Sequence, residues 1–273
     1  MINLMSYVEE YNYGVTPIYS YEQKNHKSQA TGFFYKDIEH GNTPYLITNR
    51  HVIIDEREDF YADSIEIEIH CSSNITRQVR VVRIPLYDNG HKPIWLEFPF
   101  LEKMYVDIVA INLQSYCYDS DHYYYWDKND YPNKSQIETQ GNSIRVIGYP
   151  QGIHDYIHKL PIARHATIAS PYTIAYLNKP YFIIDVNLHP GMSGSPVIIP
   201  NSGVRPGNQK LKIHPLLGIL SAGKLNLELG IVWYPQLIQE LIENNLRGIL
   251  RTSIADINKM YKNQVILHAR TSS

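Results

Sequence analysis

A serine close to two glycines is the first group in this sequence that could carry out covalent chemistry. Residues 190–196 read Pro-Gly-Met-Ser-Gly-Ser-Pro and precede the apolar run 197–199. A serine that attacks a carbonyl group needs an exposed hydroxyl and backbone N–H groups that stabilise the oxyanion formed beside it. Glycines allow the tight turn that presents both. The segment alone fits a simple turn between strands equally well, and Ser195 competes with Ser193 as the nucleophile.

Two further residues could assist such a serine. His51 follows the apolar run 45–47 after a short polar step, and a histidine can take up and return a proton near neutral pH. Asp107 lies in the apolar run 106–113, where a buried carboxylate needs a partner. That partner is either structural, an arginine or backbone amides, or the Nδ1–H of a histidine. We favour the histidine, because His51, Asp107 and Ser193 occur together.

The elements that must position these residues are mainly strands. Short apolar runs rich in Val, Ile, Tyr and Phe alternate with turn residues, which is typical of an all-β protein. Examples of these runs lie at 30–35, 44–48, 65–70, 79–84, 106–113, 143–147, 181–186, 196–199 and 216–220. Residues 37–42 predict a hairpin turn, and an apolar stripe over 235–244 predicts one helix near the end.

The strand pattern lapses between about 114 and 141, which predicts a link between two halves. We therefore expect a first half over 1–115 with His51 and Asp107, a link over 116–141 and a second half over 142–251 with Ser193. The sequence of the tail 252–273 does not indicate a role for it. The tyrosines between 116 and 131 are interleaved with aspartates, and we interpret them as surface loop.

Five motifs in this chain resemble those of the trypsin-like, chymotrypsin-fold serine peptidases, especially the bacterial HtrA/DegP protease domains, here without a PDZ domain. They are Ala-Thr-Gly-Phe-Phe at 30–34, Thr-Asn-Arg-His-Val at 48–52, Val-Asp-Ile-Val-Ala-Ile at 106–111, Gly-Tyr-Pro-Gln-Gly at 148–152 and Pro-Gly-Met-Ser-Gly-Ser-Pro at 190–196. The resemblance implies two antiparallel six-stranded β-barrels with a C-terminal helix. It also implies a serine endopeptidase with His51 as base, Asp107 as its orienting partner and Ser193, rather than Ser195, as nucleophile.

The same resemblance implies an oxyanion hole at Gly191, Met192 and Ser193, formed by the amides of Gly191 and Ser193. Met192 stands where secreted trypsins have the aspartate that pairs with a newly cut N-terminus, so activation by such cleavage is not expected. Substrate-binding residues carried over by position are Asn187, Ser221, Ala222 and Gly223. They predict a neutral, small or apolar side chain before the cleaved bond.

The composition of the chain limits which classes of partner and which cellular location we expect. A net charge of -2 and a pI near 6.6 argue against nucleic-acid binding. Two cysteines, no signal-peptide pattern and no long apolar run predict a cytoplasmic protein without a membrane span. Metal-binding and phosphate-binding motifs are absent from the sequence, so we expect no metal and no cofactor.

We expect a polypeptide substrate. Two alternatives stay open: a protease that a protein partner activates, and a binding module that has kept the protease fold without catalysis.

Overall fold

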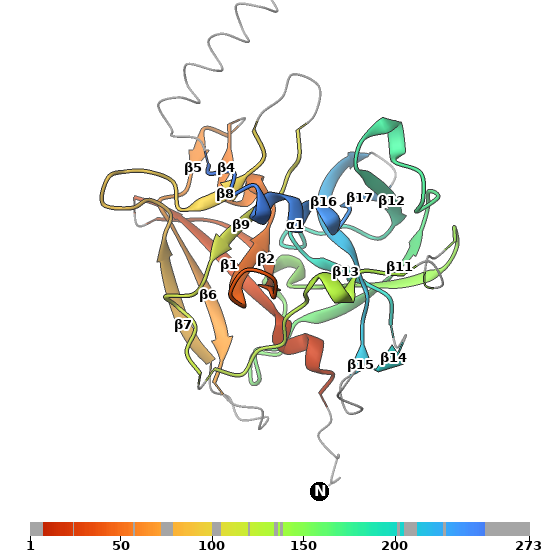
Figure 1. The fold of residues 1–273 in the computed structure, drawn as a ribbon, viewed down its shortest axis with the longest axis horizontal. Helices are drawn as coiled ribbons and strands as arrows, with labels where there is room; N and C mark the ends of the chain where they lie inside the picture. Colours follow the sequence, from red (N-terminus) through yellow and green to blue (C-terminus); the bar gives the residue numbers. More distant parts are fainter. Residues whose placement is uncertain are drawn as a thin grey trace, which may run out of the picture.

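The computed structural model describes residues 8–248, except for 24, 57, 72–78, 100–104, 120, 134–135, 137–138, 201–202, 205–211 and 226–227. The tail 252–273 therefore lies outside the described residues. Within them the chain is mainly β-structure, with one α-helix, α1 (Gln236–Glu243), where the apolar stripe predicted it. The strands form two large antiparallel sheets, which lie on opposite sides of Figure 1 with α1 between them.

The first half is a curled sheet of seven strands in the order β7-β6-β1-β2-β3-β9-β8. Its strands are β1 (Val15–Glu22), β2 (Asn25–Asp37), β3 (Thr43–Thr48), β6 (Ser64–His70), β7 (Val79–Pro85), β8 (Trp95–Glu97) and β9 (Val109–Asn112). The seventh strand adds to the six of the expected barrel. Edge strand β8 is covered by the segment after α1, because Gly248 N donates to Trp95 O and Glu97 N donates to Leu246 O.

The second half is a closed six-stranded barrel in the order β10-β11-β12-β17-β16-β13. Its strands are β10 (Ser143–Gly148), β11 (Ile162–Ile168), β12 (Tyr181–Asp185), β13 (Pro196–Ile198), β16 (Leu216–Leu225) and β17 (Leu229–Trp233). Two short hairpins lie outside the large sheets: β4 (Ile54–Asp55) with β5 (Phe60–Tyr61), and β14 (Gly203–Val204) with β15 (Lys212–Ile213). The predicted all-β fold of two barrel-type halves is confirmed, while the exact boundaries at 115, 141 and 251 stay predictions.

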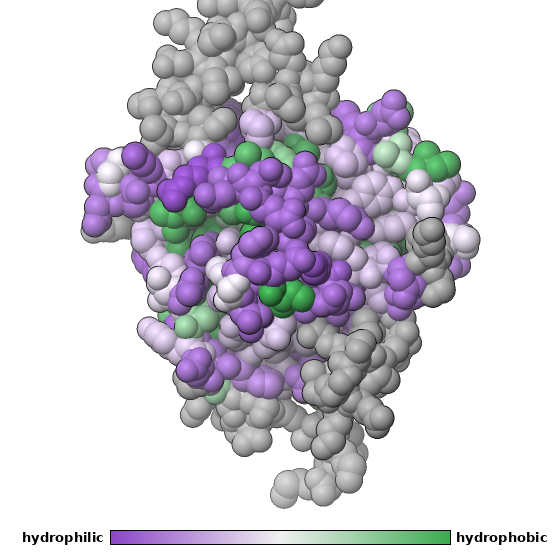
Figure 2. Space-filling model, in the orientation of Figure 1, coloured by the Kyte–Doolittle hydropathy of each residue, from purple (hydrophilic) through white to green (hydrophobic). Residues whose placement is uncertain are grey.

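Three apolar cores hold the two halves. One lies inside the first half, one lies inside the second, and the third contains residues of both, such as Phe33 and Ile47 with Ile147 and Ile219. Helix α1 packs Leu237, Ile238, Leu241 and Ile242 into this shared core. The face drawn in Figure 2 is mostly hydrophilic with small separate apolar patches, as expected when the large apolar side chains are buried inside.

The link is packed more tightly than the sequence predicts. Tyr124 and Trp126 are buried in the shared core, and Trp126 Nε1 donates to His214 O of the second half. The interpretation of this tyrosine-rich stretch as surface loop is therefore wrong for its centre. The alternation of tyrosines with aspartates predicted that the rings are exposed to solvent. Instead, the rings of Tyr124 and Trp126 pack in the core shared by the two halves.

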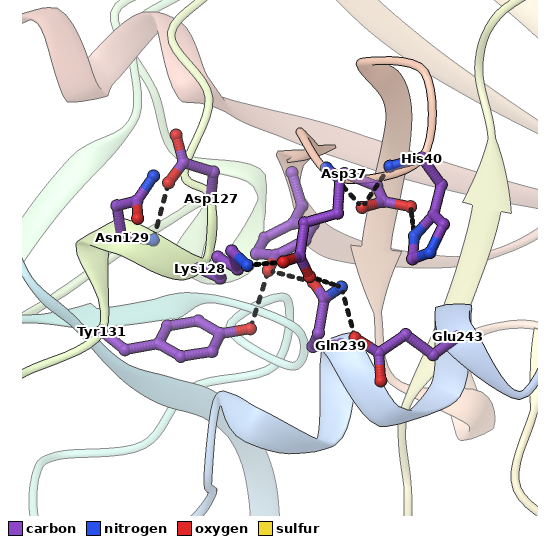
Figure 3. Close-up of polar contacts among 10 residues, drawn as sticks. Asp37, His40, Asp127, Lys128, Asn129, Tyr131, Gln239 and Glu243 are labelled. Carbon is purple, nitrogen blue, oxygen red and sulfur yellow. Dashed lines mark hydrogen bonds and ion pairs between the residues drawn. The ribbon is translucent and has the colours of Figure 1, made fainter.

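A polar group of side chains also joins the halves, and we call it the Gln239 cluster: Tyr35, Glu39, Lys128, Tyr131, Gln239 and Glu243. Gln239 of α1 accepts from Tyr35 OH of β2 at 3.0 Å and donates to Glu243 and Glu39. Lys128 and Tyr131 reach the cluster from the link, as Figure 3 shows. Three distant parts of the chain are thereby held together.

Candidate active site

His51 and Asp107 are neighbours because of the register between two adjacent strands. In the antiparallel pair β3 and β9, Thr48 lies opposite Val109, so β3 ends where β9 begins. His51 follows β3 by three residues in the short 3₁₀ turn η2 (Arg50–Val52), and Asp107 precedes β9 by two. Asn49 Nδ2 donates to Asp107 O at 2.7 Å, and the strand begins at Val109 rather than at 106.

Ser193 reaches the same place from the second half. It lies in the turn 189–195, called here the Ser193 turn, between β12 and β13. His51 Nε2 lies 2.9 Å from Ser193 Oγ, and His51 Nδ1 lies 2.6 Å from Asp107 Oδ2. The structure thus brings the three predicted catalytic side chains into one hydrogen-bonded chain that crosses between the halves.

Ser195, the competing nucleophile, lies in a different environment. Its side chain is fully buried, and its Oγ has no hydrogen-bond partner among the described residues. Ser193 is partly exposed and faces the histidine. Geometry therefore favours Ser193 as the residue that can meet a substrate.

Asp107 is buried and surrounded by donors. Its Oδ2 also accepts from Ser221 Oγ at 2.6 Å, and its Oδ1 accepts from His51 N at 3.0 Å. Burial raises the pKa of Asp107, but the charge of His51 and the hydrogen bonds from His51 and Ser221 outweigh burial, so this pKa lies below its usual 3.8. An ionised carboxylate can only accept, so Nδ1 of His51 donates to it and Nε2 can accept from Ser193.

A buried ion-pair network fixes the residue before the histidine. Arg50 Nε lies 2.6 Å from Glu97 Oε2, and Arg50 Nη1 lies 2.7 Å from Glu56 Oε1. The guanidinium carbon lies 5.7 Å from the ring centre of Tyr105, whose hydroxyl lies 3.5 Å from Asp107 Oδ1. The sequence gives no signal for this network, since Arg50 and Glu97 meet only through the pairing of β9 with both β3 and β8.

Hydrogen bonds engage two carbonyl groups of the Ser193 turn. Pro190 O accepts from Gln151 N at 2.6 Å, and Met192 O accepts from Ser195 N at 3.1 Å. In a trans peptide the N–H points opposite to the C=O, so the Gly191 and Ser193 N–H groups face the other way. Gly191 has φ +91°, and a Cβ there would lie 2.4 Å from Tyr149 O. Met192 N donates to His189 O, so its amide is directed away from the predicted oxyanion hole.

The predicted substrate-binding residues do not lie together at one place in the structure. Ser221 Oγ donates to Asp107 Oδ2, so its side chain points to that carboxylate. Asn187 is exposed and does not line the cavity at Ser193. The backbone of Ala222 and Gly223 forms part of strand β16.

A cavity of about 380 Å³ opens beside His51 and Ser193. It is lined by β2 residues 28–30 and by Val52 and Phe60 after the histidine. Four carboxylates also line it, from Glu22, Asp55, Glu58 and Asp59. The sequence did not predict this cavity, because much of its wall comes from residues 22, 28–29, 55 and 58–60, which lie outside the five motifs.

Among the described residues, no three His, Cys, Asp or Glu side chains are grouped so that they could hold a metal ion. No helix in the described ranges has the length and apolar character needed to cross a membrane. Cys71 and Cys117 both carry free thiols.

Comparisons with known proteins identify the family of this chain. The model of the trypsin-like peptidase domain family matches residues 30–204. The crystal structure of a serine endoprotease from Yersinia pestis is similar over 88% of this chain and 67% of its own, with 14% sequence identity and a TM-score of 0.50. The crystal structure of the Rv3671c protease from M. tuberculosis in its active form is similar over 85% of this chain and 80% of its own, with 16% sequence identity and a TM-score of 0.46. The family match spans more than half of the chain, which therefore belongs to the trypsin-like peptidase family of serine endopeptidases.

Proposed function

We propose that this chain cleaves polypeptides through an acyl-enzyme formed on Ser193, with His51 and Asp107 as the other members of a catalytic triad. The observation that carries the proposal is the hydrogen-bonded chain from Ser193 Oγ through His51 to the buried Asp107. Each link has the length of a good hydrogen bond, and the carboxylate is ionised as the mechanism requires.

The reaction has two halves. Ser193 Oγ attacks the carbonyl carbon while His51 Nε2 takes the hydroxyl proton, and His51 then gives that proton to the leaving amine as the C–N bond breaks. Water next attacks the acyl-enzyme, with His51 again as base, and releases the carboxylic acid and free Ser193. Asp107 keeps Nδ1 protonated and stabilises the imidazolium of both steps.

The Gly191 and Ser193 N–H groups would bind the oxyanion. The carbonyls of Pro190 and Met192 are turned away by hydrogen bonds, which supports this role for the two amides. Donors of this kind are each worth roughly 2.7–4 kcal/mol in other enzymes. Because the turn already has this orientation, its conformation favours activity without a partner; an activating partner and a cytoplasmic location stay predictions from the sequence.

The cavity suggests where the substrate lies. The leaving amine must approach His51 Nε2, so the chain after the cleaved bond would enter the cavity that begins at His51. Its carboxylates would disfavour acidic side chains there. The expected neutral side chain before the cleaved bond also stays a prediction.

Labelling with a fluorophosphonate tests the proposal and separates it from a binding module without catalysis. The wild-type chain should be labelled at Ser193 and should hydrolyse casein, whereas Ser193→Ala and His51→Ala should do neither. Ser195→Ala is the matched control, since it removes a buried hydroxyl two residues away, and it should label like the wild type. Absence of wild-type labelling, or equal labelling of Ser193→Ala, would refute the proposal.

A further inference from the structure

Thr31 of β2 occupies an unusual position beneath the Ser193 turn. It is fully buried, and its hydroxyl donates to Gly191 O at 2.7 Å and accepts from Tyr149 N at 3.1 Å. Its backbone N donates to Ser193 O at 2.9 Å, while its own carbonyl accepts from Thr48 Oγ1 at 2.8 Å. One residue of the first half is thus bonded to the turn twice and to the second half's Tyr149 once.

These bonds fix the peptide plane that matters for an oxyanion hole. The Ser193 N–H belongs to the peptide between Met192 and Ser193. The peptides on either side of it carry Gly191 O and Ser193 O, and Thr31 holds both of these carbonyls. A plane between two fixed planes has little freedom, so Thr31 helps to set the direction of the Ser193 N–H, together with the bond from Ser195 N to Met192 O within the turn.

We propose that Thr31 is a positioning residue that keeps the oxyanion-binding turn in its active conformation through its side-chain hydroxyl. The inference rests on the proposed function of Ser193. It also explains how the turn can stay ordered with Met192 at its centre: the Met192 side chain is buried in the second half's own core and offers no charge for an ionic anchor. A neutral hydrogen bond from the neighbouring half supplies the anchor instead.

The hydroxyl, rather than the volume of the side chain, is the essential feature. Valine has nearly the same shape as threonine but can neither donate to Gly191 O nor accept from Tyr149 N. Both backbone groups are buried, so losing their shared partner is unfavourable in the present conformation. Rotation of the peptide that follows Gly191 would relieve the unpaired carbonyl, and the next peptide, which carries the Ser193 N–H, would then lose the fixed neighbour that keeps this N–H directed at the oxyanion.

The test compares Thr31→Val with Thr31→Ser and Thr16→Val. Thr31→Val should lower kcat on a peptide amide up to about a hundredfold and leave KM within about threefold, because the loss concerns the transition state. Affinity for a peptide aldehyde, whose adduct with Ser193 places an oxyanion in the hole, should fall by a similar factor. Thr31→Ser keeps the hydroxyl and should retain most of kcat.

Thr16→Val is the matched control. Thr16 is also fully buried in the first sheet, and its hydroxyl likewise joins a carbonyl and an amide, both of Glu68, but it does not contact the Ser193 turn. Rates are expressed per active site titrated with a fluorophosphonate, so unfolded protein does not lower them, and Thr31→Ala serves as a second variant without the hydroxyl.

The outcomes separate two failures. Wild-type kcat in Thr31→Val, or an equal loss in Thr31→Ser or Thr16→Val, would overturn the role of the Thr31 hydroxyl. A wild-type chain that neither hydrolyses the substrate nor reacts with the fluorophosphonate would instead overturn the proposed function.

Discussion

Asp107 shows how much of the site depends on donors that come from different elements. Its carboxylate accepts from the backbone and ring of His51 and from the hydroxyl of Ser221 on β16. The sequence predicted the histidine partner, because a buried carboxylate needs one. The substrate-binding role assigned to Ser221 stays a prediction. Its bond to Asp107 was not predicted, since the direction of a strand side chain depends on a register that the sequence does not show.

Another buried ionisable residue, His70, makes stability depend on pH. Burial, and next the nearby His122, lower the pKa of His70 from 6.5 to about 4. Between these values the unfolded chain binds a proton that the folded chain does not, so stability falls as the pH falls from 6.5 to 4 and is fully retained above 6.5. We expect a loss of up to about 3 kcal/mol across this window.

The free energy of unfolding in urea, measured at steps of pH, checks this expectation. His70→Gln should flatten the slope between pH 6.5 and 4. His165→Gln changes an exposed histidine on β11 in the same way and should leave the slope as in the wild type. An identical slope in His70→Gln and the wild type would contradict the assignment to His70.

At the scale of elements, apolar runs predicted the centres of most strands and the helix, but not all strands. In the two large sheets, β8, β17, β11 and β1 were not among the predicted runs. β11 carries Arg164 and His165 on a half-exposed strand, and β1 contains Pro17. Tertiary pairing overrides both signals: each strand lies between two partners in its sheet. The Ser193 turn was predictable from its glycines. Thr31 lies in the motif at 30–34, but nothing in the sequence indicated that its hydroxyl would bond to this turn.

The glycine after Ser193 gives a prediction for the turn itself. Gly194 has φ +84°, and a Cβ there would lie 2.1 Å from Thr31 O and 2.4 Å from Thr48 Oγ1. Gly194→Ala should therefore push the turn away from β2 and lower kcat about a hundredfold, since misplacement by 1 Å has that effect in other enzymes. Hydrolysis of a peptide amide measures kcat, and thermal unfolding measures stability.

Gly141→Ala is the control that separates two effects of Gly194→Ala, the displacement of the turn and the backbone strain at a positive φ. Gly141 has φ +87°, but a Cβ there would meet no described atom within 4 Å. This variant should lose only the roughly 1–2 kcal/mol of left-handed strain and keep kcat. If both variants lost kcat equally, the close approach of Gly194 to Thr31 would not be the cause.

Considered as a whole, the molecule places its reacting groups where two halves meet. Ser193 comes from the second half and His51 from the first, and the shared apolar core lies between the sheets that carry them. The sequence predicted this division from the position of the link. It could not predict the shared core, because Phe33, Ile147 and Trp126 belong to three segments whose contacts are set only by folding.

The Gln239 cluster, drawn in Figure 3, is the polar counterpart of that core. Gln239→Ala removes the acceptor of Tyr35 OH and the donor to Glu39, which should lower the free energy of unfolding by about 1 kcal/mol. The shared core should still hold the halves, so we expect one unfolding transition and nearly unchanged kcat. Gln236→Ala, at an exposed position of the same helix, controls for helix propensity and should leave stability almost unchanged. Urea unfolding followed by tryptophan fluorescence decides: two transitions in Gln239→Ala would mean that the cluster, rather than the core, couples the halves.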